Sequence, residues 1–167
     1  IGYYDKYHAE SLGDFAKWRN WATVPHIRVY RGVSSDMSTT EIYATTIHEL
    51  AHAAHWQLVV KASGSNRVED FLSADNKLTE SWALGVETSF TRHFVKSNYD
   101  LYNNVGSYHN KDNYTEIVLE LMEDAGYTLK ELEACLPKAK NLKQWENNIK
   151  AKYEKDDEKL KAIFDKY

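Results

Sequence analysis

Several classes of protein are excluded by what this sequence of 167 residues lacks. Cys135 is the only cysteine, so the chain can form neither an internal disulfide nor a cysteine-based metal site. No apolar run approaches the roughly 18 residues that a membrane-spanning helix needs. The formal net charge is only −4 and charges of both signs are interspersed, so no basic stripe predicts a nucleic-acid partner. What remains is a chain of one-domain size that is long enough to bury a core.

Length and composition predict one domain over residues 1–167. The chain begins at Ile1 rather than methionine, so we expect a processed or excised piece of a longer protein, whose targeting segment need not be included. The lack of disulfides is compatible with an exported or cell-envelope location in a bacterium, but it does not fix the compartment. No feature of the sequence fixes the oligomeric state.

Hydrophobic spacing predicts a mainly helical α+β fold with a short strand before the main helix. Residues 3–21 carry aromatic and leucine side chains at roughly helical spacing. Residues 26–31 alternate in polarity, which predicts a short strand. Ser38-Thr39-Thr40-Glu41 matches a capping box, and this predicts the start of a helix that continues to about Lys61.

The rest of the chain is also predicted to be mostly helical, apart from a polar, irregular stretch over residues 97–113. Capping and terminating residues set the expected boundaries. The helices expected here run from Asp75 or Thr79 to about Lys96, from Tyr114 to Ala125 with Gly126 as its cap, from Thr128 to Pro137, and from Asn141 onward as one or two amphipathic helices.

His48-Glu49-Leu50-Ala51-His52 is the most informative stretch of the sequence. It is an H-E-x-x-H motif inside the helix predicted from Ser38. Positions i and i+4 lie on one face of a helix about one turn apart, so both imidazoles can reach one metal ion. The glutamate between them is then placed to take a proton from a metal-bound water. The motif predicts a zinc hydrolase, most often a peptidase, with Zn²⁺ as cofactor and a peptide or protein as substrate.

A hydrolytic zinc site usually has three protein ligands and one position open for water, so a third ligand is needed. His55 is close in sequence, but together with His48 and His52 it would span about 10 Å of helix rise, which is too far for one tetrahedral ion. His55 is more simply a hydrogen-bonded helix residue or part of a cleft wall. Glu80 lies on the next predicted helix and can approach the ion from another direction. Glu87 shares that face and is an alternative ligand, an acceptor for a histidine N–H, or a surface carboxylate.

The segment that begins at Glu80 resembles the third-ligand segment of the gluzincins, above all of the zinc aminopeptidases. There the ligand glutamate is followed by a small residue, an aromatic residue and an alanine, with another glutamate seven positions on; the matching residues are Glu80, Ser81, Trp82, Ala83 and Glu87. The resemblance covers residues 39–90. The chain departs from these aminopeptidases in two respects. The gap between His52 and Glu80 is longer than theirs, and their exopeptidase substrate motif is not visible before the metal-binding helix.

The resemblance implies a compact zincin-like metallopeptidase domain with His48, His52 and Glu80 as metal ligands, but it does not extend to aminopeptidase specificity. The chain as a whole is also similar to zinc peptidases of bacteria. Gluzincins usually stabilise the oxyanion with a tyrosine or histidine supplied from downstream, and Tyr108, His109 and Tyr114 occupy that region. Tyr114 is the first choice because it starts a predicted helix, although any of the 12 tyrosines could be a packing residue.

The strand around Ile27 to Tyr30 precedes the metal helix, as the upper edge strand does in zincins, where it would pair with an extended substrate. Arg28 and Arg31 on this strand could select acidic substrate groups, although exposed arginines more often only favour solubility. Two other interpretations stay open. One is a catalytically inactive zincin-like domain that binds a peptide or glycan, and the other is a structural helical domain in which the motif is fortuitous.

Overall fold

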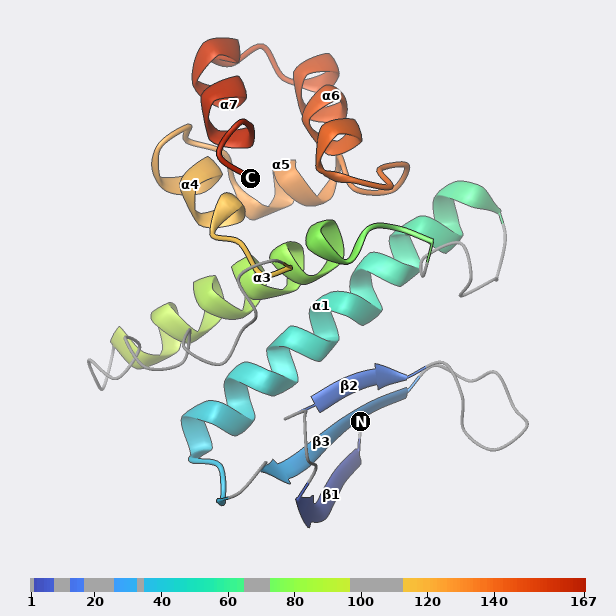
Figure 1. The fold of residues 1–167 in the computed structure, drawn as a ribbon, viewed down its shortest axis with the longest axis vertical. Helices are drawn as coiled ribbons and strands as arrows, with labels where there is room; N and C mark the ends of the chain where they lie inside the picture. Colours follow the sequence, from blue (N-terminus) through green and yellow to red (C-terminus); the bar gives the residue numbers. More distant parts are fainter. Residues whose placement is uncertain (1, 8–12, 17–25, 33–34, 65–72, 97–112) are drawn as a thin grey trace. The chain divides into compact units, whose positions relative to one another are not determined.

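The computed structural model describes residues 2–7, 13–16, 26–32, 35–64, 73–96 and 113–167 (Figure 1). Strands come first and helices follow, which confirms the mainly helical fold with a small sheet ahead of the helix that carries the motif. The chain divides into two compact units, Ile1–Ala53 with Val86–Tyr108, and Ala54–Gly85 with His109–Tyr167. Within the described ranges, no helix is both long enough and apolar enough to cross a membrane.

In the first unit, three strands form one mixed sheet in the order β1-β3-β2. β1 (Gly2–Tyr7) runs parallel to β3 (His26–Gly32), and β2 (Gly13–Ala16) runs antiparallel to β3. Ile27 and Val29 on β3 are buried and alternate with less buried neighbours, as the period of two along a strand requires. The strand predicted at residues 26–31 is therefore confirmed.

Two expectations about this part of the chain are wrong. Residues 2–7 and 13–16 are strands rather than parts of a helix over residues 3–21; residues 17–21 lie outside the described ranges. Strand preference depends mainly on cross-strand neighbours, so pairing with β3 overrides the helical spacing of the aromatic residues. In addition, β3 is not an edge strand, because β1 occupies one of its sides and β2 the other. It therefore has no free edge that could pair with a substrate.

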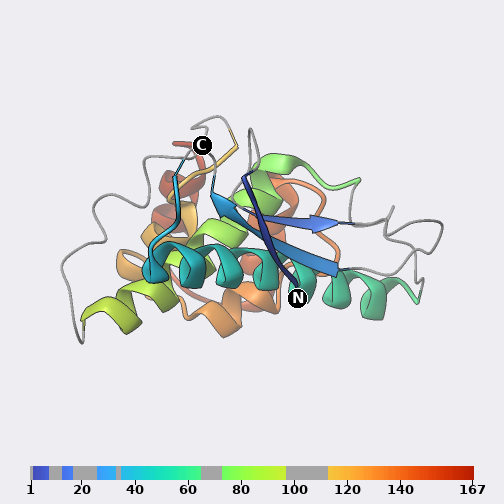
Figure 2. The same ribbon diagram turned by 90° about the horizontal axis from the view of Figure 1, so that it is seen from below.

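The helix α1 (Thr39–Ser63) carries the H-E-x-x-H motif. Its predicted capping box is present: Glu41 N donates to Ser38 Oγ at 3.2 Å, and Ser38 N donates to Glu41 Oε2 at 2.7 Å. The helix ends at Gly64, whose φ of 66° is a left-handed conformation that glycine adopts without strain. Figure 2 shows the sheet beside the N-terminal part of α1. Both predicted boundaries of this helix are confirmed to within two residues.

The helix α3 (Asn76–Lys96) is the predicted second long helix. In its first half, Gly85 allows close packing, since a Cβ there would lie only 2.2 Å from Cβ of Val118 in α4 (Ile117–Glu123). In its second half, Phe94 stacks on Tyr43 of α1 with ring centroids 4.6 Å apart. The middle of α3 therefore packs on α4, and its C-terminal end packs on α1.

The second unit is built around Trp145. Its C-terminal helices are α5 (Leu129–Glu133), α6 (Leu142–Lys152) and α7 (Asp157–Phe164). The ring of Trp145 is fully buried and makes edge contacts with Trp82 and Phe164, at centroid distances of 6.2 and 5.8 Å. Its indole N–H donates to the carbonyl oxygen of Leu132, so the only polar atom of the ring is satisfied inside the core.

Most expectations for the C-terminal part are confirmed. The capping box at Thr128 is present, Gly126 follows α4 with a φ of 71°, and the tail from residue 141 forms the two helices α6 and α7. Two boundaries are wrong: α4 begins at Ile117 rather than at Tyr114, and α5 ends at Glu133, before Pro137. The backbone N–H of Thr115 donates to Ser81 Oγ, so the chain just before α4 is held by a side chain of α3.

Candidate metal centre

His48 and His52 lie one turn apart on α1 and are both buried, each with 7% of its surface exposed. Their Nε2 atoms are 3.1 Å apart, and the two rings are nearly perpendicular, at 81°. Two imidazoles bound to one tetrahedral zinc at about 2.0–2.1 Å would place their nitrogens roughly 3.3 Å apart. The i, i+4 spacing therefore brings two ligand atoms to one point, as the motif predicts.

Glu87 on α3 orients the first of these histidines. His48 Nδ1 lies 2.9 Å from Glu87 Oε2, and the two side chains are only 9% and 4% exposed. With a neutral imidazole and an accepting carboxylate, Nδ1 carries the proton and Nε2 of His48 keeps its lone pair. This tautomer is the one that can bind a metal through Nε2. Of the roles considered for Glu87, the structure shows the acceptor for a histidine N–H.

Glu80 completes the group. One ligand atom from each of His48, His52 and Glu80 can be chosen so that all three lie within 4.8 Å of one another. Among the described residues, these three side chains form the group that is placed to hold a metal ion. Two imidazole nitrogens and one carboxylate oxygen form a donor set that zinc accepts. His55 and Glu87, which the sequence left open as ligands, are not members of the group.

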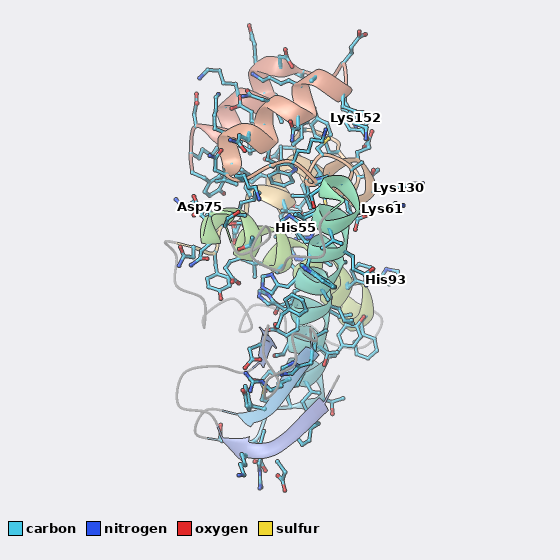
Figure 3. All side chains as sticks on the ribbon, turned by 90° about the vertical axis from the view of Figure 1, so that its right-hand side faces the viewer. His55, Lys61, Asp75, His93, Lys130 and Lys152 are labelled. Carbon is cyan, nitrogen blue, oxygen red and sulfur yellow. The ribbon has the colours of Figure 1, made fainter. Side chains whose placement is uncertain are left out.

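His55 is completely buried on α1 (Figure 3). It lies outside the group of His48, His52 and Glu80, as its position farther along a straight helix requires. Of the two roles expected for His55, its zero exposure argues against the wall of an open cleft, and the hydrogen-bonded role stays a prediction.

Glu49 is the third functional residue of the motif, and its side chain is 5% exposed. Strand β2 approaches it closely: a Cβ built on Gly13 would lie 3.1 Å from Glu49 Cγ and 2.6 Å from Thr45 Cγ2. The backbone of β2 therefore lies directly against the face of α1 that carries Glu49. Nothing in the sequence indicates this contact, because it joins residues more than 30 positions apart.

A second polar feature follows Glu80 directly. Ser81 Oγ donates to the carbonyl oxygen of Asn113 at 3.2 Å and accepts from Thr115 N at 3.1 Å and from Thr115 Oγ1 at 2.8 Å. These bonds hold both neighbours of Tyr114, which is half-buried and precedes α4. The expectation that Tyr114 starts a helix is wrong, but its backbone is fixed in another way. Tyr108 and His109 lie outside the described residues.

The two arginines considered for substrate selection are paired within the sheet region. Arg28 Nε lies 2.7 Å from Asp14 Oδ1, and Asp14 Oδ2 accepts from the hydroxyl of Tyr30 at 2.7 Å. Arg31 Nε lies 2.5 Å from Asp36 Oδ1, and its Nη1 lies 3.3 Å from Asp5 Oδ1. Both side chains therefore have acidic partners in the same chain.

In comparisons with protein-family models, with curated proteins and with solved structures, no match to this chain was found. The geometry of the site is therefore the basis for any functional conclusion.

Proposed function

We propose that this chain is a zinc-dependent hydrolase of the gluzincin type, most simply a peptidase, and that its 167 residues form one catalytic domain. The observation that carries the proposal is the group of His48, His52 and Glu80, whose candidate ligand atoms lie within 4.8 Å of one another. The hydrogen bond from His48 Nδ1 to Glu87 supports it, because metal-binding histidines usually donate their second N–H to such an acceptor.

In this proposal His48, His52 and Glu80 hold the ion. When bound, Zn²⁺ polarises a carbonyl and lowers the pKa of a coordinated water toward about 7. Glu49 follows the first ligand in the motif and is buried, so its carboxylate accepts the proton of the attacking water and returns it to the leaving amine. Glu87 keeps His48 in the tautomer that this arrangement needs.

Tyr114 is the proposed donor to the oxyanion. Its support is indirect: Ser81, the residue after the ligand Glu80, hydrogen-bonds to both neighbours of Tyr114. A donor on a backbone fixed in this way loses little conformational freedom when it acts on a transition state.

An extended substrate would pair with an edge strand rather than with β3. Among the described strands, β2 lies at one edge of the sheet and pairs only with β3. Gly13 of β2 lies next to Glu49. We therefore assign to β2 the substrate-pairing role that was expected for residues 27–30.

The test compares the wild-type protein with Glu49→Gln for zinc content and for hydrolysis of a broad peptide library. We expect about one zinc per chain in both proteins, and a loss of hydrolysis of roughly 100-fold or more in the variant, because the general base is removed. Glu158→Gln, at an exposed position on α7, is the matched control and should behave as wild type.

Three outcomes would contradict the proposal in different ways. If the wild type holds no zinc and its melting temperature does not rise when zinc is added, the metal site is wrong. If zinc binds and both proteins cleave equally well, Glu49 is not the base. If zinc binds and no peptide is cleaved although peptides or glycans bind, the chain is an inactive binding domain.

A further inference from the structure

We propose that Gly13 is a positioning residue for the general base: the backbone of β2 at this position fixes the side chain of Glu49, and only glycine permits the approach. The inference rests on the proposed function, since it assigns a role relative to Glu49. The proposed function concerns the helices that carry the metal ligands, whereas this inference concerns the sheet, which contributes no residue to the group of ligands.

β2 and α1 are in tight contact at Gly13, on the side where a Cβ atom would lie. A Cβ on Gly13 would lie 2.6 Å from Thr45 Cγ2, 3.1 Å from Glu49 Cγ and 3.1 Å from the carbonyl oxygen of Arg28. Nonbonded carbon atoms are normally about 3.5–4.0 Å apart. Thr45 and Glu49 are four residues apart and so occupy successive turns of one helix face. The strand therefore lies across the face of α1 that presents the base.

The other side of β2 is also held. Gly13 pairs with Val29, and Asp14 pairs with Arg28, in the register of β2 on β3. Asp14 bonds to the Arg28 guanidinium through one oxygen and to the Tyr30 hydroxyl through the other, both at 2.7 Å. Successive side chains of a strand point to opposite faces, so these bonds lie on the face of the sheet that is away from α1. They hold β2 to β3, so β2 can move away from the helix only if β3 moves with it or these bonds break.

A side chain at position 13 must therefore displace something on α1. Thr45 is β-branched, and such residues have restricted χ1 angles in a helix. The 2.6 Å contact with Thr45 Cγ2 is therefore relieved by a shift of the β2 backbone, and Glu49, whose unbranched side chain has more rotatable bonds, changes its position against the shifted strand. Displacing its Cγ moves the carboxylate, and the three atoms nearest to the added Cβ belong to Thr45, Arg28 and Glu49 rather than to a metal ligand. Gly13 thus acts on Glu49 and not on zinc affinity.

The experiment measures how two small ligands bind to the cobalt-loaded protein, followed by the absorption bands of Co²⁺. Acetohydroxamate ligates the ion and carries a proton that a neighbouring carboxylate accepts, so its affinity reports on the position of Glu49. The thiolate of 2-mercaptoethanol has no such proton once it is bound, so it reports on the ion alone. We expect Gly13→Ala to weaken acetohydroxamate about tenfold or more, with the affinities for thiol and zinc within about threefold of wild type.

Three further variants separate positioning from loss of stability. Gly126→Ala changes a glycine with a φ of 71° and no atom within 4 Å of the added Cβ, so it destabilises the fold without touching the site and should bind acetohydroxamate normally. Adding Thr45→Ser to Gly13→Ala removes the methyl group that the new Cβ would meet at 2.6 Å, and should restore most of the affinity. Asp14→Ala tests the same role without adding an atom to the core, by releasing β2, and should weaken acetohydroxamate several-fold.

The inference is overturned if Gly13→Ala and Asp14→Ala both bind acetohydroxamate as the wild type does. It is also overturned if Gly126→Ala weakens acetohydroxamate equally, or if thiol affinity falls in parallel, because the effect would then follow general stability or the metal. If the wild type itself holds neither zinc nor cobalt, the proposed function fails, and the role of Gly13 fails with it. If the metal binds and only the difference between ligands is missing, the role of Gly13 alone fails.

Discussion

His48 Nδ1 donates to Glu87 Oε2 across 2.9 Å, and this pair joins α1 to α3 in the interior of the protein. The bond leaves the lone pair of His48 on Nε2, 3.1 Å from Nε2 of His52. The carboxylate also stabilises any positive charge that metal binding places on the ring. One hydrogen bond thus determines both the tautomer and the direction of a candidate metal ligand.

Glu87→Ala should weaken zinc binding by about 10- to 100-fold, because His48 loses the acceptor that orients its ring. Glu87→Gln should cost less, since its amide oxygen can still accept from Nδ1 but carries no charge. Zinc affinity, measured by competition with a chelator, distinguishes the variants. Equal affinities in the wild type and Glu87→Ala would show that the bond has no influence on the metal.

Glu80→Ala should cost most of the zinc affinity, because it removes one of three ligands. His55→Ala is the informative comparison, since His55 is fully buried on the same helix as His48. It should retain zinc and lower the free energy of unfolding, by about 2 kcal/mol. The same chelator competition, with urea unfolding of each apo protein, checks both outcomes. Zinc lost from His55→Ala and retained by Glu80→Ala would reverse the ligand assignment.

Ser81→Ala should lower the free energy of unfolding by about 1–3 kcal/mol, because Thr115 N and the Asn113 carbonyl lose their partner. Thr115→Ser keeps the hydroxyl and is the matched control. If Tyr114→Phe reduces peptide hydrolysis, Ser81→Ala should reduce it as well, with zinc retained. Normal hydrolysis by Ser81→Ala beside an impaired Tyr114→Phe would show that these bonds do not position the tyrosine.

Glu146 should make the second unit sensitive to acid. It is 2% exposed, and Lys143 Nζ and Lys150 Nζ lie 2.5 and 3.1 Å from its oxygens. Burial alone would raise the pKa of Glu146, but hydrogen bonds from the two lysines outweigh burial and hold it below its usual value of 4.5. A lowered pKa in the folded state means that the unfolded chain takes up the proton first. The stability from this group is therefore present above about pH 4.5 and is lost as the pH falls through the folded pKa.

The measurement for Glu146 is urea unfolding at pH 7 and at pH 3. Glu146→Gln should lower the free energy of unfolding more at pH 7, where the ion pairs exist in the wild type, than at pH 3. Glu158→Gln, at an exposed position on α7, should show a much smaller difference. An equal loss at both pH values would mean that the ion pairs do not contribute to the pH dependence.

Several features followed from the sequence because they depend on residues within about four positions of one another. The two histidines of the motif share a face by helix geometry alone. The capping boxes at Ser38 and Thr128 are equally local, and both are present. The left-handed glycine after α4 also belongs to this class.

The errors concern contacts between distant segments. Residues 2–7 and 13–16 have helical spacing, but they form strands because β3 offers them pairing partners. The same pairing puts β3 in the centre of the sheet rather than at its edge. Neither outcome is visible in the segment itself.

The sequence by itself determined that two imidazoles meet on one helix face, since a rise of about 1.5 Å per residue and a turn of 3.6 residues place positions i and i+4 together. Only the tertiary structure decided how the two downstream glutamates divide their roles, with Glu80 beside both histidines and Glu87 on the far nitrogen of His48. It also decided that the backbone at Gly13 lies against Glu49. Both results depend on how distant segments pack, and packing depends on the shapes of both partners, which no single stretch of sequence contains.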